Sequence, residues 1–162
     1  MDYNNSHIVR ECIRELNLFQ AKQAYPVLFA ASEVFSEQEF EKLLKLVSTI
    51  SFRCTVISGL NPNELEVQYN ALATDVSEGK VKTTRAVFGL ISAAAYTVNE
   101  KFIQDFSRLS IQTKRQKSLV KYILGKSEKD RVNKDVTEDS FSVEPILPQA
   151  PNESWRQNFD EL

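Results

Sequence analysis

The sequence is poor in the residues that build metal sites, hydrolytic triads and tight turns. It contains one histidine, two cysteines, four glycines and five prolines among 162 residues. With no Cys-x-x-Cys or His-x-x-x-His spacing, we expect no zinc site. The single histidine, His7, lies in a polar segment where we expect the first turn of a helix, not a catalytic base. The scarcity of glycine and proline favours long helices over a many-turned sandwich or barrel.

Long apolar runs are also absent. No stretch approaches the roughly 20 apolar residues that cross a bilayer, and the polar start of the chain does not resemble a signal peptide. Cys12 and Cys54 both lie in apolar helical patterns. Buried thiols in a reducing cytoplasm are the favoured interpretation, and a disulfide or metal pair is the alternative. We therefore expect a soluble, cytoplasmic protein with no membrane partner.

Apolar residues, 42% of the chain, recur mainly at helical spacing. The pattern predicts an all-α domain of about seven helices in residues 1–132, followed by an irregular tail, 133–162, with one short strand. Ser36 and Glu39 form a capping box, in which each side chain can bond a helix-start amide. The run from Val27 to Ala31 is apolar nearly all round, so we expect it in the central helix of the core. The predicted helices begin near Ser6, Tyr25, Ser36, Asn61, Thr84, Asn99 and Thr113.

The tail differs in composition and charge. Residues 141–148 mix β-branched residues with prolines, which is typical of a short strand entering a loop. Residues 112–134 contain eight basic and two acidic side chains, a net charge of +6, whereas residues 135–162 contain seven acids and one arginine, a net charge of −6. Three interpretations of the basic segment remain open: a solvated face, a surface that faces phosphates, and a docking surface for the acidic tail.

Residues 141–159 read FSVEPILPQAPNESWRQNF. This segment resembles the start of the C-terminal nuclease domain of GmrSD-type, modification-dependent restriction endonucleases. Three upstream stretches, 25–30, 52–54 and 121–124, are loosely similar to helices of the same family. The residues that match the nuclease segment are Val143, Glu144, Ile146, Leu147, Pro148, Gln149, Trp155 and Phe159.

The resemblance implies a nuclease of the HNH, or ββα-metal, type. In that chemistry a histidine activates water while a divalent metal, Mg²⁺ or Mn²⁺, neutralises developing charge. Pro145 occupies the family's histidine position and cannot accept a proton. Glu144 is the remaining candidate metal ligand. We therefore expect no complete catalytic site and no cofactor-binding site in this chain.

The first functional hypothesis is that the chain is the helical portion of a DNA-targeting restriction-type protein. On that view it is a fragment, whose partners are DNA, an N-terminal nucleotide-binding domain and the rest of the nuclease. The residues expected near DNA phosphates are Lys114, Arg115, Lys117 and Lys121. The alternative is a non-catalytic helical scaffold or dimerisation module with a decayed nuclease motif, for which a homodimer is the expected form.

Overall fold

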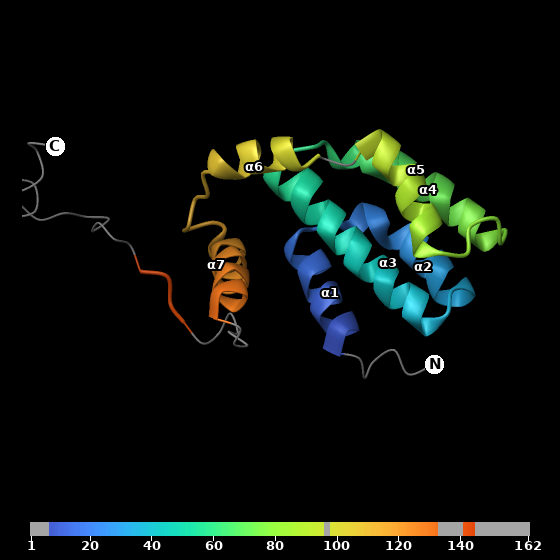
Figure 1. Cartoon of the computed structure of the whole chain (residues 1–162), viewed down its shortest axis with the longest axis horizontal. Coiled ribbons are helices and arrows are strands. Elements are labelled where there is room, and N and C mark those ends of the chain that lie inside the picture. The colour runs from blue at the N-terminus through green and yellow to red at the C-terminus, as the bar shows by residue number, and fades with distance from the viewer. Residues whose placement is uncertain (1–6, 96–97, 133–140, 145–162) are drawn as a thin grey trace, which may run out of the picture. The chain divides into compact units, whose positions relative to one another are not determined.

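The computed structural model describes residues 7–95, 98–132 and 141–144. Within these ranges the chain forms seven α-helices and no strand, which confirms the all-α prediction (Figure 1). The chain divides into two compact units, Met1–Ser110 and Ile111–Leu162. The helices are α1 (His7–Leu18), α2 (Tyr25–Val34), α3 (Glu37–Ile50), α4 (Pro62–Ser77), α5 (Thr84–Ala95), α6 (Asn99–Ser107) and α7 (Lys117–Val132), with a short 3₁₀ helix η2 (Lys22–Ala24) and a π-helix η3 (Ser51–Ile57).

The predicted helix boundaries of the first unit follow from local chemistry. The Ser36 hydroxyl accepts a hydrogen bond from the Glu39 amide at 3.4 Å and so begins α3. Asn61 begins α4 in the same way, through the Asn63 amide at 3.1 Å, with Pro62 at the first helical position. Gly79 ends α4 in the left-handed conformation, with φ of 70°. A residue with a Cβ is strained there.

The second half of the capping box is not formed as predicted. The Glu39 carboxylate accepts a 2.8 Å hydrogen bond from the Thr84 amide, and the Thr84 hydroxyl donates to the Glu39 carbonyl at 2.8 Å. Glu39 therefore caps α5, 45 residues away, instead of the start of its own helix. Its hydrogen bond from Lys42, followed by the bond from Thr84, lowers the pKa of the Glu39 carboxyl.

The helix predicted to begin near Ser36 changes its winding after Ile50. From Ser51 the chain continues as the π-helix η3, and the Ser58 amide donates to the Arg53 carbonyl five residues back at 3.1 Å. The last amide reaches further, from Leu60 to the Cys54 carbonyl, at 2.8 Å. Gly59, with φ of 65°, makes that turn possible. Winding of this kind is rare and is found frequently at functional sites.

The side chain presented by η3 is Arg53, which connects η3 to α6. Its guanidinium donates to the Asn99 Oδ1 atom at 2.9 Å and lies 4.3 Å from the centre of the Phe102 ring. Phe52 is the neighbour of Arg53 in the chain. The centre of its ring is 5.5 Å from that of Phe19 and 6.3 Å from that of Phe102. No residue of α6 is buried. These polar and aromatic contacts therefore contribute much of what holds α6 on the first unit.

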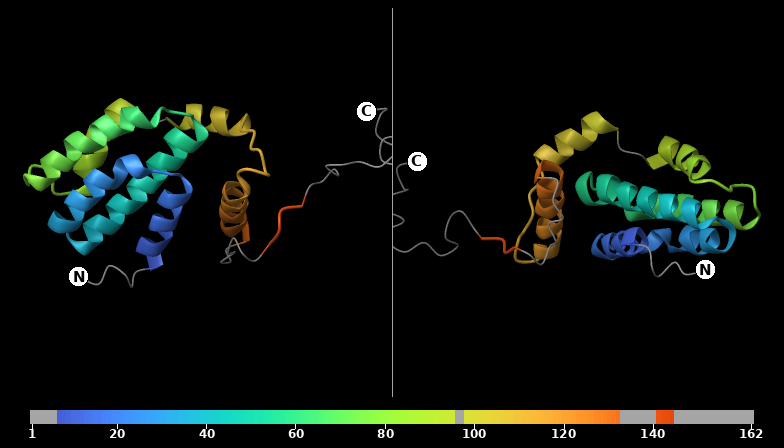
Figure 2. Two further views of the ribbon diagram at one scale, coloured as in Figure 1. Left: turned by 180° about the vertical axis from the view of Figure 1, so that it is seen from behind. Right: turned by 60° about the horizontal axis from the view of Figure 1, so that its bottom comes forward.

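The core of the first unit forms where α3 and α4 meet their neighbours. The most extensive contact joins α2 to α4, and α3 packs against α1, α2 and α5. Helices α1 and α2 lie along the same side of α3 (Figure 2). Cys12 and Cys54 are buried and form no disulfide, as expected. The largest side chains with less than 2% exposure are Tyr69, Leu43, Leu44, Ile50, Leu65 and Ile91.

The prediction that α2 is buried all round is wrong. Val27, Leu28 and Ala31 are buried, but Phe29 is 70% exposed and Val34 is 42% exposed. Contacts with α3 and α4 therefore cover one face of α2 and leave the other exposed. The described residues contain no helix with the length and apolar character needed to span a bilayer.

In the second unit, the start of the tail packs on α7. A Cβ placed on Gly125 would lie 3.7 Å from the Phe141 ring, and the Lys121 Nζ atom is 5.7 Å from the ring centre. Residues 141–144 form no strand, contrary to the prediction for this part of the tail. A strand needs a second extended segment for its ladder hydrogen bonds, and here Phe141 meets a helix instead. Residues 145–148 of the predicted strand lie outside the described residues.

Candidate functional site

The basic side chains of the second unit gather around the start of α7. Residues 111–132 contain seven basic and two acidic side chains. Lys114, Arg115 and Lys117 are exposed, and Lys121 is half-buried beside Phe141. Three of the four predicted phosphate-binding residues are therefore on the surface. Lys114 and Arg115 lie in the turn before α7, and Lys117 is the first residue of the helix.

The backbone adds to the positive potential at this point. A turn precedes α7, in which the amides of Arg115 and Gln116 donate to the Gln112 carbonyl at 2.9 and 3.0 Å. The bond from the Val120 amide to the Gln116 carbonyl, 3.1 Å, follows. The amides of the first helical turn point out of a helix end and carry partial positive charge. No acidic residue lies in that turn to offset it.

Helix stability does not explain this arrangement. Cations at a helix N-terminus are unfavourable, and the corresponding favourable placements are worth about 0.3–1 kcal/mol each at exposed sites. Lys129 and Arg131, by contrast, lie in the last turn of α7, where the dipole favours them, and Arg131 approaches the Glu128 carboxylate at 3.8 Å. The start of α7 is thus a local concentration of positive charge that fits an anion such as a phosphate.

The described residues of the tail provide no metal centre. Glu144 is exposed, and its carboxylate accepts a 3.0 Å hydrogen bond from the Ser142 hydroxyl. Among residues 7–95, 98–132 and 141–144, no three His, Cys, Asp or Glu side chains are grouped as a metal site. One carboxylate does not fit the several oxygen ligands that Mg²⁺ or Mn²⁺ requires. Pro145 lies outside the described residues.

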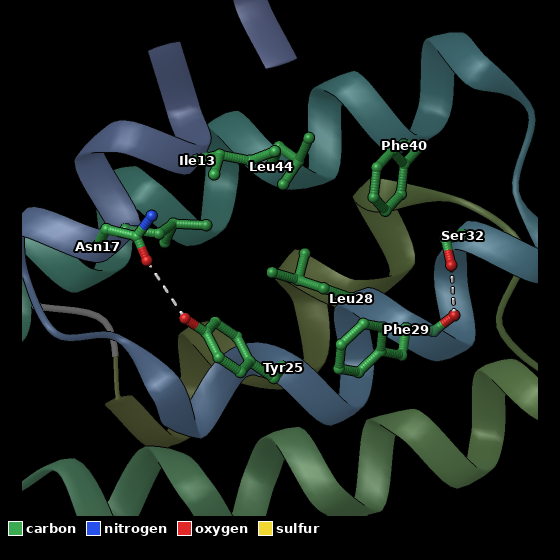
Figure 3. A pocket seen from close by; sticks show the side chains of 9 residues that line it. Ile13, Asn17, Tyr25, Leu28, Phe29, Ser32, Phe40 and Leu44 are labelled. Atoms are coloured by element: carbon green, nitrogen blue, oxygen red, sulfur yellow. Dashed lines mark hydrogen bonds between the residues drawn. The ribbon is translucent and has the colours of Figure 1, made fainter. Parts of the chain in front are cut away.

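An apolar groove on the first unit is a feature that the sequence analysis missed. It lies between α1, α2 and α3 and has a volume of about 280 Å³ (Figure 3). Phe29 and Ile13, which are 70% and 48% exposed, lie on its α2 and α1 sides. The apolar run 27–31 could have indicated this groove, because its apolar residues surround the helix and one buried face cannot cover them all. The lining residues are Ile13, Leu16, Asn17, Tyr25, Leu28, Phe29, Ser32, Phe40 and Leu44.

The polar atoms of the groove bond to one another or to the backbone. The Tyr25 hydroxyl donates to the Asn17 Oδ1 atom at 3.4 Å, and the Ser32 hydroxyl donates to the Phe29 carbonyl at 2.7 Å (Figure 3). These bonds leave a surface that offers mainly apolar contact. Such a surface suits a protein partner better than a small ligand that must be oriented by several polar groups.

No protein-family model matches the chain, and neither a curated protein nor a solved structure is found to be similar to it.

Proposed function

We propose that the chain is the helical portion of a DNA-targeting, restriction-type protein, and that the start of α7 contacts the DNA phosphate backbone. The observation that carries the proposal is the grouping of Lys114, Arg115 and Lys117 at a helix N-terminus, where they cost helix stability. The resemblance of residues 141–159 to the opening of a nuclease domain supports the same assignment.

The contact expected at this surface positions DNA and does not read its sequence. Lysine and arginine side chains that neutralise phosphates release condensed counterions, which gives affinity that is independent of sequence and steep in salt. Aromatic side chains do not alternate with the basic residues of 111–117, as they do on surfaces that stack single-stranded bases. Duplex DNA is therefore the expected ligand. No catalytic step is proposed for this chain.

The test is the affinity of the full chain for a fluorescently labelled duplex of about two helical turns, measured by anisotropy. A variant that carries Lys114→Ala, Arg115→Ala, Lys117→Ala and Lys121→Ala removes the proposed phosphate contacts. We expect it to bind about 10- to 100-fold more weakly at low salt, because each contact contributes to the electrostatic part of the affinity. Unchanged binding would refute the assignment.

A matched variant separates position from net charge. Lys22, Lys45, Lys82 and Arg85 are exposed basic residues of the first unit, and replacing all four with alanine changes the net charge by the same amount. This control is expected to keep most of the affinity. An equal loss in both variants would show that overall charge, not the start of α7, governs binding.

A further inference from the structure

The apolar groove on the first unit and the ridge beside it belong to one surface patch. Phe29 lines the groove and yet has 70% of its surface exposed, so its ring is a projection next to a hollow of about 280 Å³. We propose that this patch binds a second copy of the chain, with the α2 ridge of each copy seated in the groove of the other.

A two-fold axis parallel to the groove allows both contacts to form at once, with Phe29 of each copy in the groove of the other. An isologous interface uses the same patch on both copies, so it needs a patch that is complementary to itself. An axis that runs between the Phe29 ridge and the groove places each ring over the partner's hollow. It also brings exposed Ile13 on α1 towards the outer side of the partner's α2, so that two exposed apolar side chains become covered.

The charges that flank the patch agree with the same axis. On α1, Arg10 and Arg14 are both exposed. They lie one helical turn apart, beside Ile13 and on its solvent side. On α2, exposed Glu33 lies one turn after Phe29 on the same face. In the proposed pairing, the α1 arginines of one copy face Glu33 of the other. Electrostatic complementarity of this kind sets the orientation of partners more than their affinity.

The test is the molar mass of the full chain in solution, without DNA, by sedimentation equilibrium over a range of concentrations. The wild-type chain is expected to approach twice its mass of 18.5 kDa at tens of micromolar. Phe29→Gln removes the ridge at an exposed position and is expected to weaken association at least about 10-fold, as loss of a central aromatic anchor does. Val67→Gln is the control, because Val67 is 66% exposed on α4, outside the groove.

A charge-reversal cycle tests the orientation. Arg14→Glu and Glu33→Arg are each expected to weaken association several-fold, and the double variant is expected to recover most of the loss. Three results would overturn the proposal: a wild-type chain that stays monomeric at 200 µM or about that concentration, equal losses for Phe29→Gln and Val67→Gln, or a double variant weaker than both single variants. Because no DNA is present, these outcomes are independent of the proposed phosphate contact.

Discussion

Tyr69 is a core residue with an unsatisfied polar group. It is fully buried on α4, its hydroxyl has no hydrogen-bond partner among the described residues, and burial raises its pKa. A buried polar group without a partner costs about 1–3 kcal/mol. The Tyr69 ring nevertheless fills the core, since no other side chain of its size in the described part of the chain is as completely buried.

Tyr69→Phe is therefore expected to raise the free energy of unfolding by about 1 kcal/mol. The substitution removes the unmatched hydroxyl and keeps the ring. The measurement is urea unfolding monitored by circular dichroism, with Tyr25→Phe as a control, because the Tyr25 hydroxyl has a partner in Asn17. A loss of more than 1 kcal/mol or so on Tyr69→Phe would mean that the hydroxyl is bonded in solution.

Glu39 links the acid stability of the chain to the attachment of α5. The pKa of its carboxyl is lowered by hydrogen bonds from Lys42 and the Thr84 amide. A group whose pKa is lower in the folded state stabilises the fold above its unfolded pKa, near 4.5, and loses that contribution as pH falls through the folded value.

Glu39→Gln is expected to lower the free energy of unfolding at pH 7 by about 1 kcal/mol or less, since the side chain is partly exposed and screened. The difference from the wild type should shrink as pH falls below 4.5. Unfolding curves at several pH values between 7 and 3 measure it. A gap that stays constant across this range would show that the charge of Glu39 does not matter.

For single residues, helix caps were easier to predict from the sequence than hydrogen-bond partners that are distant in the chain. The Ser36 and Asn61 caps depend on neighbours in the chain and were predictable. The bond from Thr84 to Glu39 spans 45 residues, so no local pattern contains it. Burial also depends on distant contacts: Ile13 is exposed although it is apolar, whereas Val9 is buried on α1. Pro145 and its neighbours lie outside the described residues, and their assignment stays a prediction.

Among the elements, η3 and α6 depend on each other most directly. The π-helix turns Arg53 towards α6, where it bonds Asn99 and stacks on Phe102. Apolar spacing predicted one continuous helix, because a π-turn changes backbone winding without removing the apolar face: Cys54 and Ile57 are still buried. Its sequence has no distinguishing signal of the kind that a capping residue or a glycine provides.

Arg53→Ala is expected to detach α6 locally and to cost about 1–2 kcal/mol, the usual range for a hydrogen-bonded charge together with a cation–π contact. Arg53→Lys keeps the charge but loses the planar stacking, and should recover only part of the loss. Amide hydrogen exchange of α6 measures the effect. Unchanged protection of residues 99–107 in Arg53→Ala would show that α6 is held by other contacts.

At the scale of the molecule, composition and periodicity predicted the fold class and, for the residues that the structure describes, the number of helices and most of their starts. Few glycines and prolines, together with helical apolar spacing, leave little choice at that level. The groove was not predictable in the same way. Whether the second apolar face of α2 is buried or left open depends on which helices pack on it, and that choice is made by contacts distant in sequence.

We propose that the start of α7 is a phosphate-binding surface. Its most direct test is the salt dependence of duplex DNA affinity of the wild-type chain. Four neutralised phosphates predict a slope of log K against log salt near −3.6, from about −0.9 for each contact. A slope of about −3 to −4 that falls towards zero in the fourfold variant at Lys114, Arg115, Lys117 and Lys121 is the predicted result. A slope near zero in the wild type would contradict the claim.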